Sequence, residues 1–263
     1  MKMIERKIIM ATVSSKWSGR NVLVIGDSIT SDGRWQKEFA RMTGANIRTH
    51  ANGGIGLIDM VDGQEGSTAE DGMYDPTTGV KGKLGPLTAD AVKWADLIIL
   101  LGAYNERHME YGEVGDMYPK DNTLRGKFAY VIEKLYALLD ESDNMGCHIM
   151  LVTPHCSGKY DWIDRNGYED FPRGSGRTLG TMAELVKTIA AEYNIFCCDA
   201  YHTSGINRFT WKYYAHCPDV MNKDYSPDKK YDAPYPMYGD QAHLNGMGYA
   251  RLGDCIASAA ELA

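Results

Sequence analysis

The sequence lacks the features that mark a nucleic-acid-binding or membrane-spanning protein. Its 263 residues carry a formal net charge of -7 and the sequence pI is near 5.5, whereas a nucleic-acid binder usually shows a basic face. No window approaches the roughly 20 apolar residues that a membrane span requires. The acidic charge also gives no support to binding at an anionic membrane surface. We therefore expect neither a nucleic-acid nor a membrane partner.

Metal-type cysteine pairs are missing as well. None of the six cysteines forms a CxxC pair, and the nearby histidines fall at irregular spacings, so the sequence gives a zinc site little support. Cys147, Cys197 and Cys198 lie in apolar runs, where a free cysteine usually behaves as a small buried hydrophobe. We expect reduced thiols and no metal. The short apolar run at 8–13 has no clear cleavage site after it, so a soluble cytoplasmic protein is the default expectation, with export or incorporation in a larger assembly left open.

Two motifs of other α/β proteins are absent. The sequence has no GxSxG elbow, which disfavours one large class of α/β hydrolases, and no GxGxxG or Walker-type spacing, which disfavours a nucleotide site. Internal repeats, low-complexity tracts and obvious linkers are also lacking. We expect an N-terminal extension over residues 1–20 and a single domain over residues 21–263.

Short apolar runs alternate along the chain with amphipathic stretches. Runs typical of buried strands lie at 21–25, 96–101, 148–152 and 194–198, with a weaker candidate at 46–50. A wide apolar stripe from Phe128 to Leu139 predicts a helix, for which Asp121 or Asn122 is the expected N-cap. The last helix is expected to begin after Asn245. The alternation predicts a three-layer α/β/α sandwich with a mostly parallel five-stranded sheet.

Three long polar insertions interrupt this pattern. They span residues 63–86, 155–176 and 216–239. Loops of this length inside a compact domain are usually functional, and sites in parallel sheets lie at the carboxyl ends of the strands. We expect the insertions to rim a site at that edge.

Gly26-Asp27-Ser28 follows the first predicted strand directly. A serine placed there, at the start of a helix, exposes its hydroxyl above the sheet, and its backbone N–H can face a developing oxyanion. The same position also suits an ordinary helix N-cap, so the motif alone is weak.

A second pattern, Asp240-Gln241-Ala242-His243, precedes the last predicted helix. A serine nucleophile needs a base, and the base needs a carboxylate that fixes its tautomer. Three residues of separation on a turn allow Asp240 to reach the Nδ1 atom of His243. A bare DxxH is more often a solvated loop with a capping aspartate.

Together these patterns resemble the blocks of the SGNH, or GDSL, hydrolase family. Two further blocks stand between them in the family's order, Asn52-Gly53-Gly54-Ile55-Gly56 and Gly102-Ala103-Tyr104-Asn105-Glu106. The resemblance implies a flavodoxin-like fold and a catalytic triad of Ser28, Asp240 and His243. It also implies an oxyanion hole formed by Ser28, Gly54 and Asn105, with no metal and no organic cofactor.

The match to the family blocks departs at two places. The third block carries one extra residue before Asn105, and Glu106 stands where the family usually has aspartate. In the second block Gly56 comes one position early, so Gly53 remains a rival of Gly54. These departures concern the oxyanion hole and not the triad.

The resemblance predicts an ester hydrolase, and the aromatic residues suggest its substrate. Asp27, Tyr104, Trp162 and Trp211 are the expected substrate-binding residues, because flat rings in a polar cleft suit stacking on sugars. We therefore expect a small-molecule or polysaccharide ester substrate with a short acyl group, above all acetyl. A lipase-like or thioesterase-like hydrolase, and a non-catalytic carbohydrate-binding module of the same shape, are the alternatives. The oligomeric state stays open.

Overall fold

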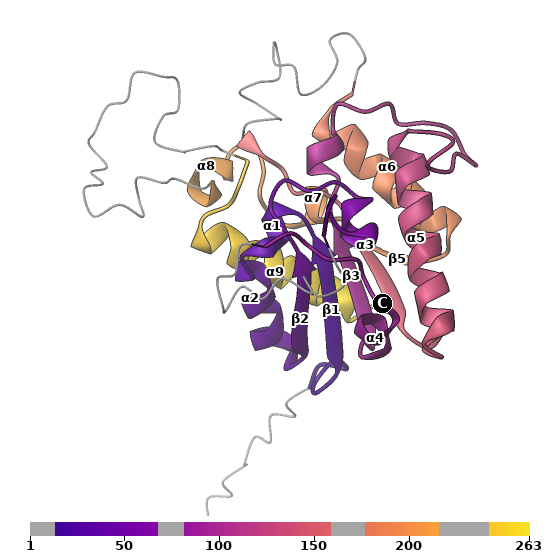
Figure 1. Ribbon diagram of the computed structural model, residues 1–263. Coiled ribbons are helices and arrows are strands. Elements are labelled where there is room, and N and C mark those ends of the chain that lie inside the picture. Colours follow the sequence, from indigo (N-terminus) through magenta and orange to yellow (C-terminus); the bar gives the residue numbers. More distant parts are fainter. Residues whose placement is uncertain (1–13, 68–81, 159–176, 216–241) are drawn as a thin grey trace, which may run out of the picture.

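The computed structural model describes residues 14–67, 82–158, 177–215 and 242–263 (Figure 1). The strands in these ranges are β1 (Asn21–Gly26), β2 (Asn46–Ala51), β3 (Leu97–Leu101), β4 (His148–Val152) and β5 (Phe196–Cys198). The longer helices are α2 (Arg34–Thr43), α5 (Leu124–Glu141), α6 (Leu179–Glu192) and α9 (Gly246–Ala260). The short helices are α1 (Ser28–Ser31), α3 (Asp59–Asp62), α4 (Ala89–Lys93), α7 (Ala200–Thr203), α8 (Trp211–Tyr214) and the 3-10 helix η1 (Tyr104–Glu106).

The five strands form one sheet in the order β2-β1-β3-β4-β5, and every neighbouring pair is parallel. Each strand lies at one of the apolar runs that the sequence analysis identified. The predicted fold class is therefore confirmed, with a fully parallel sheet among the described residues. In this order the chain leaves β1 toward β2 and later returns past it to β3, and ligand crevices form at such a switch point.

Helices cover both faces of the sheet, which explains the continuous apolar strands. All five residues of β3 are buried, as expected for a strand packed on both sides. Figure 1 shows α2 and α9 grouped apart from α5 and α6, and α2 packs directly on α9. Gly253 makes this contact close, because a Cβ there would lie 2.4 Å from the carbonyl oxygen of Trp35.

Helix α5 begins later than the sequence suggested. Thr123, and neither Asp121 nor Asn122, is its N-cap, and the Thr123 side chain accepts a hydrogen bond from the Gly126 amide at 3.1 Å. The Asp121 carboxylate instead accepts from the backbone N–H of Met117 at 3.2 Å, in the turn before the helix. By contrast, Asn245 caps α9 as predicted.

The residues just before β1 pack with the rest of the structure. Trp17, which the sequence analysis assigned to an N-terminal extension, is buried, and its indole N–H donates to the carbonyl of Ala260 at 2.8 Å. The domain that begins at residue 21 in the prediction thus includes Trp17 in its core. No helix in the described ranges combines the length and the apolar character needed to cross a membrane.

Candidate active site

The chain turns sharply from β1 into α1, and this turn carries Ser28. Asp27 is the N-cap of α1, and its carboxylate accepts from the backbone N–H of Ile29 at 3.0 Å. Gly26 permits the close approach of β1 to β3, because a Cβ would lie 2.5 Å from the carbonyl oxygen of Leu101. Ser28 is half-buried at the carboxyl edge of the sheet.

His243 reaches the same point from the other end of the chain. Its Nε2 atom lies 2.8 Å from Ser28 Oγ, across 215 positions of sequence. The buried Leu244 pairs with Ala215 in an antiparallel bridge, and Asn245 caps α9, so the two residues that follow His243 are both held in place. The hydroxyl and the imidazole are within hydrogen-bonding reach, the arrangement that activates a serine nucleophile. Asp240 lies outside the described residues, so its part in a triad stays a prediction.

Asp27 lies beneath the nucleophile and not on the substrate side. Its side chain is fully buried, and its Oδ2 atom has no hydrogen-bond partner among the residues that the structure describes. Burial raises the pKa of Asp27 to about 7, which the Ile29 N–H and the charge of His243 only partly offset. We expected a substrate-binding residue here, but a carboxyl that caps α1 inside the protein has no open surface to offer a substrate.

The glycine loop (residues 52–57) follows β2 and lies beside Ser28. A Cβ on Gly53 would be 3.9 Å from the Cβ of Ser28. The Gly53 N–H donates to the Asn52 side-chain oxygen at 2.8 Å. The alternative backbone donor to Gly54 is therefore already engaged in a hydrogen bond. Gly54 is exposed and has a φ of +78°, a left-handed conformation that favours glycine. Between the two glycines, this geometry favours Gly54 as the backbone donor.

Asn105 touches the glycine loop from the end of β3. Its Nδ2 atom donates to the carbonyl of Ile55 at 2.8 Å. The extra residue of this block is accommodated in η1, which Ala103 enters with a φ of +80°. The amide carries a second N–H, so Asn105 can hold the loop and keep one donor for another partner.

The structure buries the two described aromatic residues that we expected to bind substrate. Tyr104 is 5% exposed, and its hydroxyl accepts the His155 backbone N–H at 2.6 Å and lies 2.6 Å from His155 Nδ1. Trp211 is 7% exposed and packs on Gly158, where a Cβ would fall 2.1 Å from the indole ring. Neither ring has a face open for stacking on a sugar. Trp162 lies outside the described residues.

His155 was not among the predicted site residues. It is fully buried beside Tyr104, and burial lowers its pKa to about 3, with the positive charge of His243 as a smaller cause. A neutral His155 therefore supports the floor of the site without adding charge to it. The only sequence signal was its place just after the fourth predicted strand.

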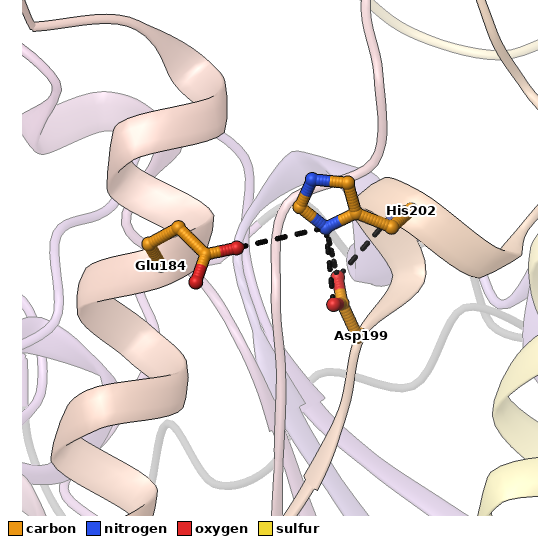
Figure 2. A group of neighbouring side chains, drawn as sticks. All are labelled: Glu184, Asp199 and His202. Carbon is orange, nitrogen blue, oxygen red and sulfur yellow. Dashed lines mark hydrogen bonds and ion pairs between the residues drawn. The ribbon is translucent and has the colours of Figure 1, made fainter.

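A second DxxH pattern, Asp199 to His202, stands at the end of β5. Figure 2 shows His202 turned toward Asp199 and Glu184, with His202 Nδ1 at 2.9 Å from the nearer Asp199 oxygen and 3.8 Å from Glu184. This trio is the one group in the described residues with ligand-like spacing for a metal. However, the Lys187 ammonium already lies 2.9 Å from Asp199 and 3.0 Å from Glu184, so a positive charge is in place. We therefore interpret Glu184, Lys187, Asp199 and His202 as a surface ion-pair network.

Among comparisons with known proteins, the one with solved structures supports the fold. No protein-family model and no curated protein sequence matches the chain. Among solved structures, it is similar to one described as a possible lipase from Chitinophaga pinensis, with 18% identity and a TM-score of 0.56 over 91% of this chain and 96% of that chain. It is also similar to a protein from Lactobacillus plantarum, with 16% identity and a TM-score of 0.53 over 92% and 96%. A lipase from a goat rumen metagenome gives 13% identity and a TM-score of 0.52 over 91% and 97%. These likenesses establish a shared fold along nearly the whole length of each chain.

Proposed function

We propose that this chain is a serine esterase that works through an acyl-enzyme intermediate. The observation that carries the proposal is the 2.8 Å contact between Ser28 Oγ and His243 Nε2, at the edge of the sheet where the fold concentrates its sites. A non-catalytic binding module has no need of a serine hydroxyl held against an imidazole. The resemblance of the four sequence blocks to SGNH hydrolases supports the same reading.

The reaction follows from the positions of these groups. Ser28 Oγ attacks the acyl carbonyl while His243 Nε2 accepts its proton, and the carbonyl oxygen becomes an anion. The backbone N–H groups of Ser28 and Gly54 and the second amide N–H of Asn105 stabilise that anion. His243 then protonates the departing alcohol. In the second half, His243 takes a proton from the water that attacks the acyl group, and it then returns this proton to Ser28 Oγ as the carboxylic acid departs. In this proposal Asp240 orients the imidazole through Nδ1.

The substrate we propose is an ester of a short acyl group, above all acetyl, on a carbohydrate. With Tyr104 and Trp211 buried, support for the carbohydrate rests on Trp162 and on the polar character of the insertions at 63–86, 155–176 and 216–239. A long acyl chain needs an extended apolar pocket, for which polar insertions are poorly suited. A lipase-like or thioesterase-like enzyme remains the alternative, with the same Ser28 and His243.

Substitution Ser28→Ala tests the activity itself. Turnover of an aryl acetate should fall by more than about a thousandfold, because the covalent step is lost and only oxyanion stabilisation and binding remain. The hydroxyl is half-buried at a turn, so the thermal unfolding midpoint should change little. Ser31→Ala, on the same short helix, is the matched control and should keep wild-type turnover. Equal rates for Ser28→Ala and wild type would refute the mechanism.

A further inference from the structure

Glu106 is buried directly behind the glycine loop. Its side chain is 5% exposed, and its two oxygens have different partners. Oε2 accepts the backbone N–H of Leu57 at 3.0 Å, and Oε1 lies 2.9 Å from the Lys127 ammonium on α5. Glu106 thus connects the loop to the long helix that covers this face of the sheet.

The glycine loop contacts the Glu106 carboxylate closely. A Cβ on Gly56 would lie 2.9 Å from Glu106 Oε1 and 3.2 Å from its Cδ, so a larger residue at position 56 would displace this carboxylate from its present place. One residue before Glu106, Asn105 holds the carbonyl of Ile55 at 2.8 Å. Two consecutive residues at the end of β3 therefore fix the loop at two points, Ile55 and Leu57. Gly54, the donor assigned to the oxyanion, is the residue immediately before these anchors.

Lys127 keeps the anchor in place. Its side chain is 17% exposed, so the pair is largely removed from water. Removing one partner of a buried ion pair leaves an uncompensated charge, which then seeks water or another partner. Without the ammonium, the Glu106 carboxylate would be drawn away from Leu57, and the loop would lose one of its two anchors.

We infer that Glu106 and Lys127 are positioning residues that hold the Gly54 N–H in place for the oxyanion. This inference rests on the proposed esterase function. Oxyanion donors act only if they are fixed before the reaction, and a displacement of about 1 Å can lower the rate by about a hundredfold. The Glu at the place of the family's usual Asp is then explained, because the longer side chain spans from the end of β3 to both partners.

Lys127→Met provides the test, because it removes the charge and keeps most of the apolar stem. We expect kcat for an aryl acetate to fall at least about tenfold, since the loss acts on the transition state, with KM within about twofold of wild type. Lys127→Arg, which keeps the charge, should restore most of kcat. Active sites are counted by titration with an aryl phosphonate, so that kcat refers to folded enzyme only.

The control is Lys134→Met, seven residues further along α5. Lys134 is 40% exposed and pairs with Asp62 at 3.6 Å, so the same substitution removes an ion pair from the same helix without touching Glu106. It should leave kcat unchanged. If Lys127→Met fails to fold, the double variant Glu106→Leu/Lys127→Met carries the test, because it removes the acceptor of the Leu57 N–H and leaves neither charge buried alone, and kcat should fall as in Lys127→Met.

The outcomes separate the two proposals. Wild-type protein without any ester turnover would refute the esterase function. An active wild type whose Lys127→Met variant, or the double variant Glu106→Leu/Lys127→Met in its place, keeps wild-type kcat or changes KM alone would overturn the positioning role and leave the function standing. A lower unfolding midpoint with unchanged kcat per active site would likewise reduce the pair to a structural ion pair.

Discussion

At the scale of single residues, the site combines the half-buried Ser28 hydroxyl with acidic groups held inside the protein. Asp27 is the extreme case, because its carboxyl is fully buried next to the nucleophile and its pKa is raised to about 7. The residue supplies the N-cap of α1, which an asparagine can supply equally well. Ionisation of the buried Asp27 should therefore lower the free energy of unfolding, and this effect can be measured.

Asp27→Asn should change the pH dependence of stability. A carboxyl with a raised pKa stays protonated in the folded protein up to about pH 7 but ionises near its model value of 3.8 when unfolded. The free energy of unfolding therefore falls as pH rises between these two values, and Asp27 lowers it by roughly 4 kcal/mol at most. Relative to wild type, the variant should gain stability progressively from pH 4 to pH 8, measured by urea unfolding.

Other buried groups do not obscure this difference. Burial lowers the pKa of His50 to about 4 and that of His155 to about 3, so both oppose folding as pH falls below the usual histidine range. They do so in wild type and variant alike and cancel in the comparison. Parallel stability curves for the two proteins would mean that Asp27 is ionised at little cost.

At the scale of elements, the position of His243 depends on how α9 lies against α2. Helix α9 starts just after His243, and its Gly253 permits contact with the backbone of Trp35, where a Cβ would lie 2.4 Å from the carbonyl oxygen. The two helices cannot move closer or tolerate a larger residue there without shifting. The packing of α2 on α9 therefore fixes the base relative to Ser28, which precedes α2 in the chain.

Gly253→Ala should destabilise the protein by about 1–3 kcal/mol, the usual cost of overpacking a close contact. Gly246→Ala is the control on the same helix, because nothing lies within 4 Å of a Cβ at that position. It should be neutral or slightly stabilising. Urea unfolding of both variants measures the difference, and equal stabilities would show that α2 and α9 adjust freely.

Sequence reasoning recovered the strands because burial on both faces makes them continuously apolar. It misplaced the start of α5, since Asp121 and Thr123 are both good caps and only the contact of Asp121 with Met117 decides between them. It also assigned Tyr104 to substrate. The Tyr104 ring is buried with its hydroxyl hydrogen-bonded to the imidazole of His155. That partner is 51 residues away, and no local sequence pattern predicts it. Glu106 was visible as a departure from a family block, but its partner Lys127 gave no signal.

At the scale of the whole molecule, the preferred length of the acyl chain tests the proposed carbohydrate substrate. An apolar pocket gains about 0.8 kcal/mol per buried methylene, so a lipase-like site should favour longer chains by about fourfold per carbon. If the polar insertions rim the site, as their sequence predicts, the enzyme should instead favour acetate. Rates on aryl acetate, butyrate, octanoate and palmitate decide between the two. A steady rise toward octanoate would overturn the carbohydrate proposal and favour a lipid or thioester, with Ser28 and His243 unchanged.

The strand order also sets when the site becomes complete during synthesis. Ser28, the glycine loop and Asn105 follow β1, β2 and β3, which are neighbours in the sheet, so the first 106 residues contain the nucleophile and the oxyanion donors. The base emerges only 137 residues after Glu106, at His243. On the proposed function, a nascent chain therefore carries an exposed serine that cannot hydrolyse esters until α9 docks on α2. If the proposed function holds, the appearance of esterase activity would time the docking of this last helix during folding.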